Sequence, residues 1–193
     1  MRVPRLLPVS LVVVVLAATA LLPSACGRNV QAVVRTMNTK PAGPAASPSA
    51  TPTRPVTVPA SLMFTGTTLD GKAFDASTLA GRPVIIWFWA PWCATCLGQG
   101  SSVSDVAAKY SGRVSLLGVA GLDQSTKAMN EFVTQADVGM VPHLNDKAGV
   151  LWKRFGIKEQ STFVMINRSG TVMQTGYMDS VTLDEWAVYL DKH

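Results

Sequence analysis

Short continuous runs of apolar residues alternate with more polar, helix-permissive stretches through the second part of the chain. Residues 84–89 and 114–119 are such runs, and their Val, Ile, Leu and aromatic content predicts buried strands. Residues 97–110 and 125–134 predict helices, the second of them capped by Ser125. Strands that alternate with helices indicate an α/β fold.

The segments around this core predict shorter elements. Residues 62–74 alternate about an Asp-Gly pair, which is typical of a β-hairpin. The remaining expected elements are a strand ending at 144–145, a short helix over 148–155, strands at 163–166 and 171–175, and a final helix opened by a capping box at 182–185. The predicted architecture is a central mixed β-sheet with helices on both faces and an N-terminal β-hairpin extension.

Two cysteines follow the 84–89 strand directly. Cys93 and Cys96 lie in the run Trp-Ala-Pro-Trp-Cys-Ala-Thr-Cys, on a strand-to-helix turn with Cys93 near the N-terminus of the helix. Backbone N–H groups and the helix dipole favour a thiolate there, and a thiolate is the species that attacks disulfides. We therefore predict a redox pair in which Cys93 is the nucleophile and Cys96 resolves the mixed disulfide.

A metal site is the main alternative for the same cysteines. Two thiolates together with His143 are a ligand set that suits Cu(I) or zinc, as in a metallochaperone. However, His143 stands in Pro-His-Leu, which is equally typical of the end of a strand, and zinc would need two more ligands beside the cysteines. The redox interpretation requires neither a metal nor another cofactor.

The distribution of charge changes the meaning of the formal net charge of +5. Six basic residues and no acidic residue precede position 60, whereas the remainder carries 11 Lys and Arg against 12 Asp and Glu. A nucleic-acid-binding protein needs a basic face on its folded part, so the composition argues against that class. The basic excess belongs to the first 59 residues.

Those first residues divide into a leader and a linker. Arg2 and Arg5 precede an apolar stretch over 11–22, so residues 1–25 are expected to be a signal peptide. Small residues leading to Cys26 resemble the lipobox of bacterial lipoproteins, which implies a lipid-modified Cys26; an uncleaved anchor or ordinary secretion are the alternatives. Six of the 12 prolines fall within 41–59, so we interpret 26–59 as a lipid-anchored Pro/Ala/Ser/Thr-rich linker to a domain at 60–193.

Motif and element order together resemble the thioredoxin superfamily, and within it the extracytoplasmic TlpA/DsbE/DsbF-like branch of redoxin-domain lipoproteins. The motifs are Phe-Trp-Ala-Pro-Trp-Cys-Ala-Thr-Cys at 88–96, Gly-Val-Ala-Gly at 118–121, Phe-Gly-Ile at 155–157 and Leu-Asp-Gly-Lys at 69–72. The resemblance implies an extracytoplasmic thiol–disulfide oxidoreductase. Its partners would be exported protein thiols or disulfides and a membrane redox protein. A peroxidase is disfavoured because Pro91 stands where peroxiredoxins carry a threonine.

Three positions depart from that family. A cis-proline usually faces the thiols, but Ser161 occupies the aligned position, and a trans bond between Gln160 and Ser161 is expected because a cis bond there costs about 3 kcal/mol. In the family this loop contacts substrate, so both residues are candidate contacts. Two acidic residues that assist the resolving cysteine in members of the superfamily, a buried aspartate and a glutamate, are replaced here by Trp87 and Gln99. Glu159 is a candidate proton acceptor, or simply a solvated loop charge.

The surroundings of the cysteines favour one direction of exchange. We expect Thr95 to donate a hydrogen bond to the Cys93 sulfur, and neither Ala94 nor Thr95 is the proline found in strong reductants. Trp92 would offer a flat surface to substrate, whereas Trp87 and Trp89 are expected in the core. The resulting hypothesis is a protein that forms disulfides in exported proteins, at the outer face of the membrane or secreted. The alternative is a reductant in cytochrome c maturation or disulfide repair. No repeat or heptad indicates obligate assembly, so a monomer is expected.

Overall fold

The computed structural model describes residues 57–193. The predicted signal peptide at 1–25, the predicted lipidation site Cys26 and nearly all of the predicted linker lie outside the described residues. Among the helices of the described part, none has both the length and the apolar content needed to cross a bilayer.

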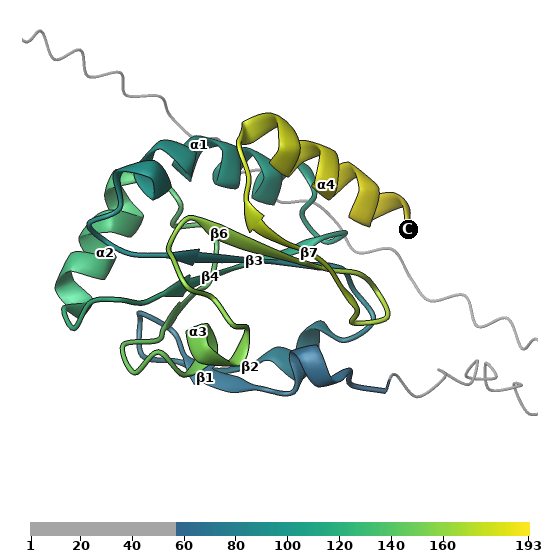
Figure 1. Ribbon diagram of the computed structural model, residues 1–193, viewed down its shortest axis with the longest axis horizontal. Helices are drawn as coiled ribbons and strands as arrows, with labels where there is room; N and C mark the ends of the chain where they lie inside the picture. Colours follow the sequence, from purple (N-terminus) through teal and green to yellow (C-terminus); the bar gives the residue numbers. More distant parts are fainter. Residues whose placement is uncertain (1–56) are drawn as a thin grey trace, which may run out of the picture. The chain divides into compact units, whose positions relative to one another are not determined.

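A five-stranded mixed sheet forms the centre of the domain, in the order β5-β4-β3-β6-β7 (Figure 1). The strands are β3 (Val84–Trp89), β4 (Ser115–Ala120), β5 (His143–Asn145), β6 (Thr162–Ile166) and β7 (Val172–Tyr177). The central strand β3 runs parallel to β4 and antiparallel to β6, and all six of its residues are buried. A strand buried on both faces carries no polar alternation, which explains the continuous apolar run.

Helices cover the two faces of this sheet unequally (Figure 1). One face packs against α1 (Ala94–Lys109), α2 (Thr126–Gln135) and α4 (Ser180–Lys192), and the other against α3 (Val150–Arg154) and the N-terminal segment. That segment contains the 3-10 turns Ala60–Leu62 and Ala76–Leu79 and the hairpin of β1 (Thr65–Thr67) and β2 (Ala73–Asp75). The predicted thioredoxin-like fold and its hairpin extension are confirmed.

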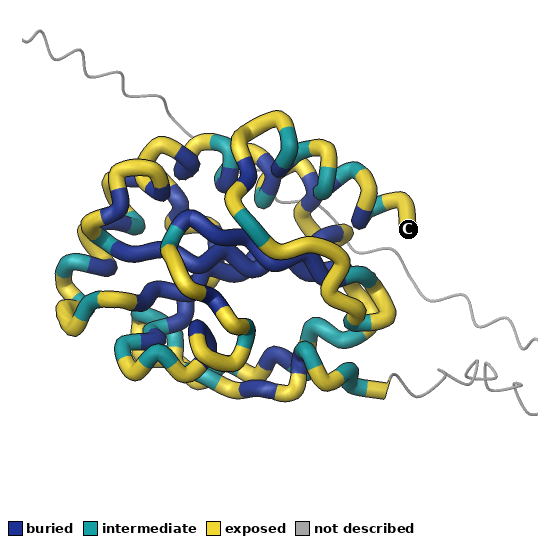
Figure 2. The backbone as a smooth tube through the Cα atoms, in the orientation of Figure 1, coloured by how far each residue is buried: buried dark blue, intermediate teal, exposed yellow. Residues whose placement is uncertain are grey.

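Alternate residues of β3 divide the core into two clusters. Ile85, Trp87 and Trp89 join the cluster beneath α1, α2 and α4, which also contains both cysteines. Ile86 and Phe88 join the cluster on the opposite face. Figure 2 shows β3, β4 and β6 as almost continuously buried, whereas the edge strand β7 is mostly exposed. Trp87 and Trp89 are core residues, as predicted, and they belong to the same buried cluster as the two cysteines.

Two helix starts differ from expectation. Helix α1 begins at Ala94 rather than at 97, because the Cys93 side chain itself acts as its N-cap. The final helix α4 begins at Ser180, and Asp179 accepts the backbone N–H of Thr182. The predicted capping box at 182–185 is therefore wrong, because an aspartate three residues upstream already caps the helix.

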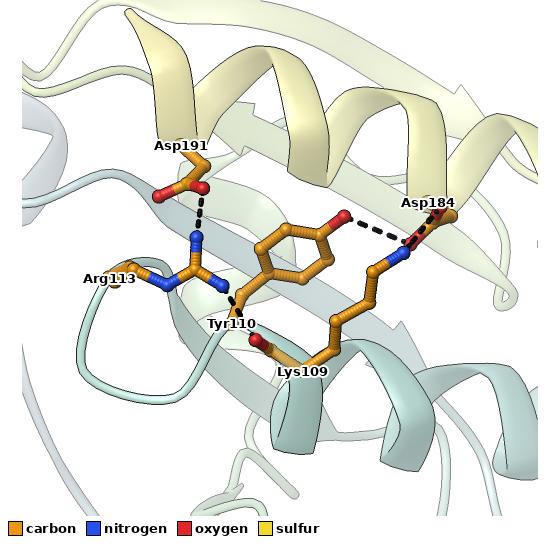
Figure 3. A network of polar contacts seen from close by, with 5 residues as sticks. All are labelled: Lys109, Tyr110, Arg113, Asp184 and Asp191. Carbon is orange, nitrogen blue, oxygen red and sulfur yellow. Dashed lines mark hydrogen bonds and ion pairs between the residues drawn. The ribbon is translucent and has the colours of Figure 1, made fainter.

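Helices α1 and α4 are joined by a polar network at the surface (Figure 3). Lys109 donates to both carboxylate oxygens of Asp184, at 2.8 and 3.0 Å, and the Tyr110 hydroxyl donates to the same carboxylate at 3.1 Å. Arg113, which follows α1, pairs with Asp191 at the C-terminal end of α4. The network orients α4 against α1, although exposed ion pairs of this kind add little stability.

Candidate active site

Cys93 and Cys96 form a disulfide at the N-terminus of α1, with their Cα atoms 5.2 Å apart. The backbone N–H of Cys96 donates to the Cys93 sulfur at 2.9 Å. Cys93 is 4% exposed and Cys96 is 0% exposed, so an incoming thiolate can approach only the Cys93 sulfur. An N–H group that points at this sulfur, in the first turn of a 16-residue helix, favours negative charge on it after the disulfide opens.

The residues between the cysteines point outward. Ala94 and Thr95 are both exposed. In the disulfide form the Cys93 sulfur accepts a hydrogen bond from the backbone N–H of Cys96 and none from the Thr95 hydroxyl. The expected Thr95 bond concerns the thiolate and stays a prediction. An N-cap side chain folds back onto the N–H groups of the first turn, which explains why the Cys93 sulfur accepts the Cys96 N–H.

A neutral hydrogen-bonded pair occupies the two positions where acidic helpers are absent. The Trp87 indole N–H donates to Gln99 Oε1 at 3.1 Å, and Gln99 Nε2 donates to the Met178 carbonyl at 2.9 Å. Gln99 is 7% exposed and Trp87 is fully buried. The core cluster that contains both cysteines therefore receives no carboxylate from these positions, and no negative charge there opposes a thiolate.

His143 forms a second buried hydrogen-bonded pair, and its ring packs against that of Trp87. Trp89 donates its indole N–H to His143 Nδ1 at 3.1 Å, which leaves Nε2 as the donor to the Val138 carbonyl at 3.0 Å. Burial lowers the pKa of His143 to about 4, against a smaller opposing effect of the Val138 carbonyl. Both ring nitrogens are engaged in the interior, so His143 offers no third ligand to the cysteine pair. In the described part of the chain, no three His, Cys, Asp or Glu residues are grouped to hold a metal.

The state of His143 predicts a pH dependence of folding. Its pKa falls from 6.5 in the unfolded chain to about 4 when folded, so the unfolded state binds the proton more tightly. Full stability is present above pH 6.5, and about 3 kcal/mol is lost as the pH falls from there to about 4. Urea unfolding at pH 7.5 and pH 5 measures the loss. Carboxylates whose pKa is lowered in the fold contribute mainly below pH 4, so a flat free energy between pH 7 and 5 would contradict this assignment.

Trp92 lies on the surface next to the disulfide. Trp92 is 57% exposed, and its indole N–H donates to the Leu122 carbonyl at 3.2 Å. Leu122 adopts φ +57° and is itself exposed, an uncommon conformation for a branched apolar residue. A hollow of about 180 Å³ adjoins this pair, lined by Pro91, Trp92, Asp123, Ala128, Glu131, Phe132 and Gln135. Part of a polypeptide could rest there while its cysteine reacts.

The loop before β6 holds the other predicted contacts. No peptide bond among residues 57–193 is cis, so the expected trans bond between Gln160 and Ser161 is confirmed. Gln160 is half-buried and Ser161 is buried, whereas Glu159 is exposed. An exposed carboxylate keeps its ordinary hydration, and nothing in its surroundings assigns it the role of a buried proton acceptor.

Sequence reasoning missed two features of the site. Gly118 on β4 lies directly against the hydrogen-bonded side chains of Trp89 and His143. A Cβ at this position would lie 2.0 Å from His143 Nδ1. A glycine inside an apolar strand is the signal that could have indicated this close approach. The conformation of Leu122 and the hollow beside it depend on contacts between loops and helix α2, for which the sequence carries no local signal.

Comparison with known proteins bears on this geometry. The AhpC/TSA family profile matches residues 58–175. The soluble secreted antigen MPT53 of Mycobacterium tuberculosis is 39% identical over 110 residues, which cover 57% of this chain and 62% of the relative. The thiol-disulfide oxidoreductase ResA of Bacillus thuringiensis subsp. konkukian is 28% identical over 111 residues, which cover 58% and 64%. The chain thus spans less than two thirds of the length of these relatives.

Two solved structures share this fold, and the match covers nearly the whole of each solved chain. A structure of MTB dsbF in mixed oxidized and reduced forms shares 40% identity at a TM-score of 0.65, covering 69% of this chain and 99% of that one. A secreted Mycobacterium tuberculosis disulfide oxidoreductase homologous to E. coli DsbE shares 35% identity at a TM-score of 0.61, covering 67% and 98%. The residues that the family profile matches contain the cysteine pair.

Proposed function

Because this chain belongs to the AhpC/TSA family of redoxins, with a thioredoxin-like fold, we propose that it is an extracytoplasmic thiol–disulfide oxidoreductase that forms disulfides in exported proteins. The observation that carries the proposal is the Cys93–Cys96 disulfide at a helix N-terminus, with only the Cys93 side reachable. Sulfur at that position is a good leaving group, because the helix stabilises its thiolate.

The exchange proceeds in two steps. A substrate thiolate attacks the Cys93 sulfur, the Cys93–Cys96 bond breaks, and the electron pair and a proton go to Cys96 as a thiol. A second substrate thiolate then attacks the substrate sulfur of the mixed disulfide and expels Cys93 as a thiolate. The substrate loses two electrons and gains a disulfide, and the protein is left as a dithiol that a redox partner must reoxidise.

The charges around the sulfurs support this direction of exchange. The Cys96 N–H stabilises the reduced, anionic form of Cys93, and the Trp87–Gln99 pair places no negative charge in the core cluster beneath it. Stabilising the reduced form makes a disulfide more oxidising. The alternative, a reductant for cytochrome c maturation or disulfide repair, requires surroundings that stabilise the disulfide relative to the reduced form.

A transfer assay tests the function directly. The oxidised full-length chain is mixed with a reduced dithiol peptide, and free thiols are counted after acid quenching. We expect one peptide disulfide to form per chain, with Cys93 and Cys96 both recovered as thiols. If the peptide stays reduced while the protein stays oxidised, the proposed function is wrong.

The proposal extends to location and partners. We place residues 1–25 as a signal peptide and 26–59 as a linker attached to lipid through Cys26, which would hold the domain at 60–193 on the outer face of the membrane near a membrane redox partner. Relatives described as secreted support an extracytoplasmic site. A Cys26→Ala chain should no longer incorporate fatty-acid label, and unchanged labelling would reject the lipid anchor at Cys26.

Trp92 is proposed as the substrate surface beside the disulfide. Trp92→Ala removes the flat ring and the contact to Leu122 while leaving both cysteines in place. We expect the second-order rate with a dithiol peptide to fall about tenfold, the effect of losing one aromatic anchor worth near 1.4 kcal/mol. The rate with a small dithiol such as dithiothreitol should change little and serves as the control. Equal losses with both substrates would place Trp92 in tuning of the disulfide instead.

A further inference from the structure

Ser161 combines three features that each cost free energy. Its backbone has φ +64°, a left-handed conformation that few residues other than glycine and asparagine adopt readily. Its side chain is 7% exposed, and its hydroxyl oxygen is buried without a hydrogen-bond partner. Across residues 57–193, only two other buried side-chain polar atoms share that last property, on Asn145 and Trp152. An unmade buried hydrogen bond costs about 1–3 kcal/mol, so a strained and unpartnered serine calls for a reason.

The sheet register places Ser161 at the end of the sheet that carries the cysteines. Thr162, the first residue of β6, pairs with Phe88 near the end of β3. Ser161 therefore lies beside the last residue of β3, where the chain continues into the turn that holds Cys93. In Figure 1 the start of β6 and the end of β3 lie at the same end of the sheet.

Ser161 precedes a strand that contributes side chains to the core cluster containing both cysteines. Phe163 and Met165 of β6 belong to the core cluster that contains Cys93 and Cys96, whereas Val164 and Ile166 belong to the cluster on the opposite face. Ser161 directly precedes this strand and is buried at its start. A buried hydroxyl without an acceptor is thus placed at the end of the sheet from which the chain turns into Cys93, whose sulfur becomes negatively charged in the reaction.

We propose that Ser161 is a positioning residue whose hydroxyl donates a hydrogen bond to the Cys93 thiolate once the disulfide has opened. In the disulfide form the Cys93 sulfur is neutral, accepts poorly and already accepts the Cys96 N–H. In the reduced form it is an anion, and hydrogen bonds to an anion are about twice as strong as neutral ones. In the disulfide form the Ser161 hydroxyl makes no hydrogen bond to either sulfur, and its acceptor in this proposal is the anionic Cys93 sulfur after it separates from Cys96.

This inference rests on the proposed function, in which Cys93 leaves as a thiolate. Two electrons from the substrate dithiol break the sulfur–sulfur bond, one proton is taken up by Cys96, and Ser161 keeps its own proton throughout. Its hydrogen bond stabilises the reduced protein alone, so it makes the disulfide more oxidising and lowers the pKa of the Cys93 thiol.

The test compares Ser161→Ala with Ser161→Gly in the full-length chain carrying Cys26→Ala, so that only the pair reacts. Both variants lose the hydroxyl, but only glycine accommodates φ +64° without strain. We expect both to shift the equilibrium with glutathione about tenfold toward the disulfide form, which is about 30 mV. Both should also raise the Cys93 pKa, measured from the pH dependence of alkylation. Their stabilities should differ, with glycine the more stable.

A neighbouring hydroxyl supplies the matched control. Thr162 is equally buried, but its hydroxyl already donates to the Glu159 carbonyl at 2.9 Å. Thr162→Val should lower stability and leave the Cys93 pKa and the glutathione equilibrium unchanged. If the alanine and glycine variants keep the parental pKa and equilibrium within twofold, the role of Ser161 is overturned although exchange continues. If the parent itself oxidises no dithiol, the proposed function fails instead.

Discussion

Replacing Cys96 by serine should make the protein trap its substrate as a mixed disulfide instead of completing thiol–disulfide exchange. In Cys96→Ser, Cys93 can attack a substrate disulfide but no thiol is left to resolve the product, so a mixed disulfide accumulates at a stoichiometry near one. Cys93→Ser should reduce exchange to the rate of the buffer alone, because Cys96 is fully buried and cannot be reached by substrate. The measurement is non-reducing electrophoresis and intact mass after mixing with a disulfide-containing peptide.

The two cysteine variants control each other. Both remove the disulfide and therefore cost the fold similar stability, so a difference in trapping reports chemistry rather than unfolding. Equal trapping by Cys93→Ser and Cys96→Ser would contradict the assignment of Cys93 as the nucleophile. The asymmetry in burial, 4% against 0%, is the structural reason for expecting a one-sided result.

The largest effect on folding is expected from Gly118→Ala. A Cβ at this position would lie 2.0 Å from His143 Nδ1 and 3.0 Å from the Trp89 indole nitrogen. The pair would have to separate, leaving a buried donor and a buried acceptor without partners in a close-packed core. We expect a loss of about 3 kcal/mol or more in the free energy of unfolding, measured by urea titration.

Gly98→Ala is the matched control for that change. Gly98 lies in α1, and a Cβ there would meet nothing within 4 Å. Alanine in an exposed helical position gains about 1 kcal/mol relative to glycine. The two identical substitutions should therefore move stability in opposite directions. A Gly118→Ala protein as stable as the parent would show that the Trp89–His143 pair does not constrain β4 as described.

Much of the fold could be predicted because its signals are local. The continuous apolar run of β3, the Asp-Gly turn between β1 and β2 and the cap at Ser125 each follow from residues close in sequence, and the structure confirms all three. The start of α4 was mispredicted because Asp179 and Thr182 both satisfy the capping pattern, and local sequence alone does not choose between them.

The site was predictable only in part. The cysteine motif placed the disulfide on a strand-to-helix turn, and the missing proline correctly indicated a trans bond before Ser161. The Trp87–Gln99 and Trp89–His143 pairs join residues 12 and 54 positions apart in the chain. Such pairings depend on which elements pack together, and periodicity does not encode them. They matter because they make the surroundings of the thiols neutral, which is the basis for expecting an oxidant.

The reduction potential of the Cys93–Cys96 pair tests the central claim most directly. The full-length chain carrying Cys26→Ala is equilibrated in glutathione buffers of defined ratio, and the oxidised fraction is read by thiol alkylation and mass. We predict a value of about −120 to −180 mV, the range of proteins that donate disulfides. A value near −270 mV, the potential of a general reductant, would contradict the proposed direction of exchange.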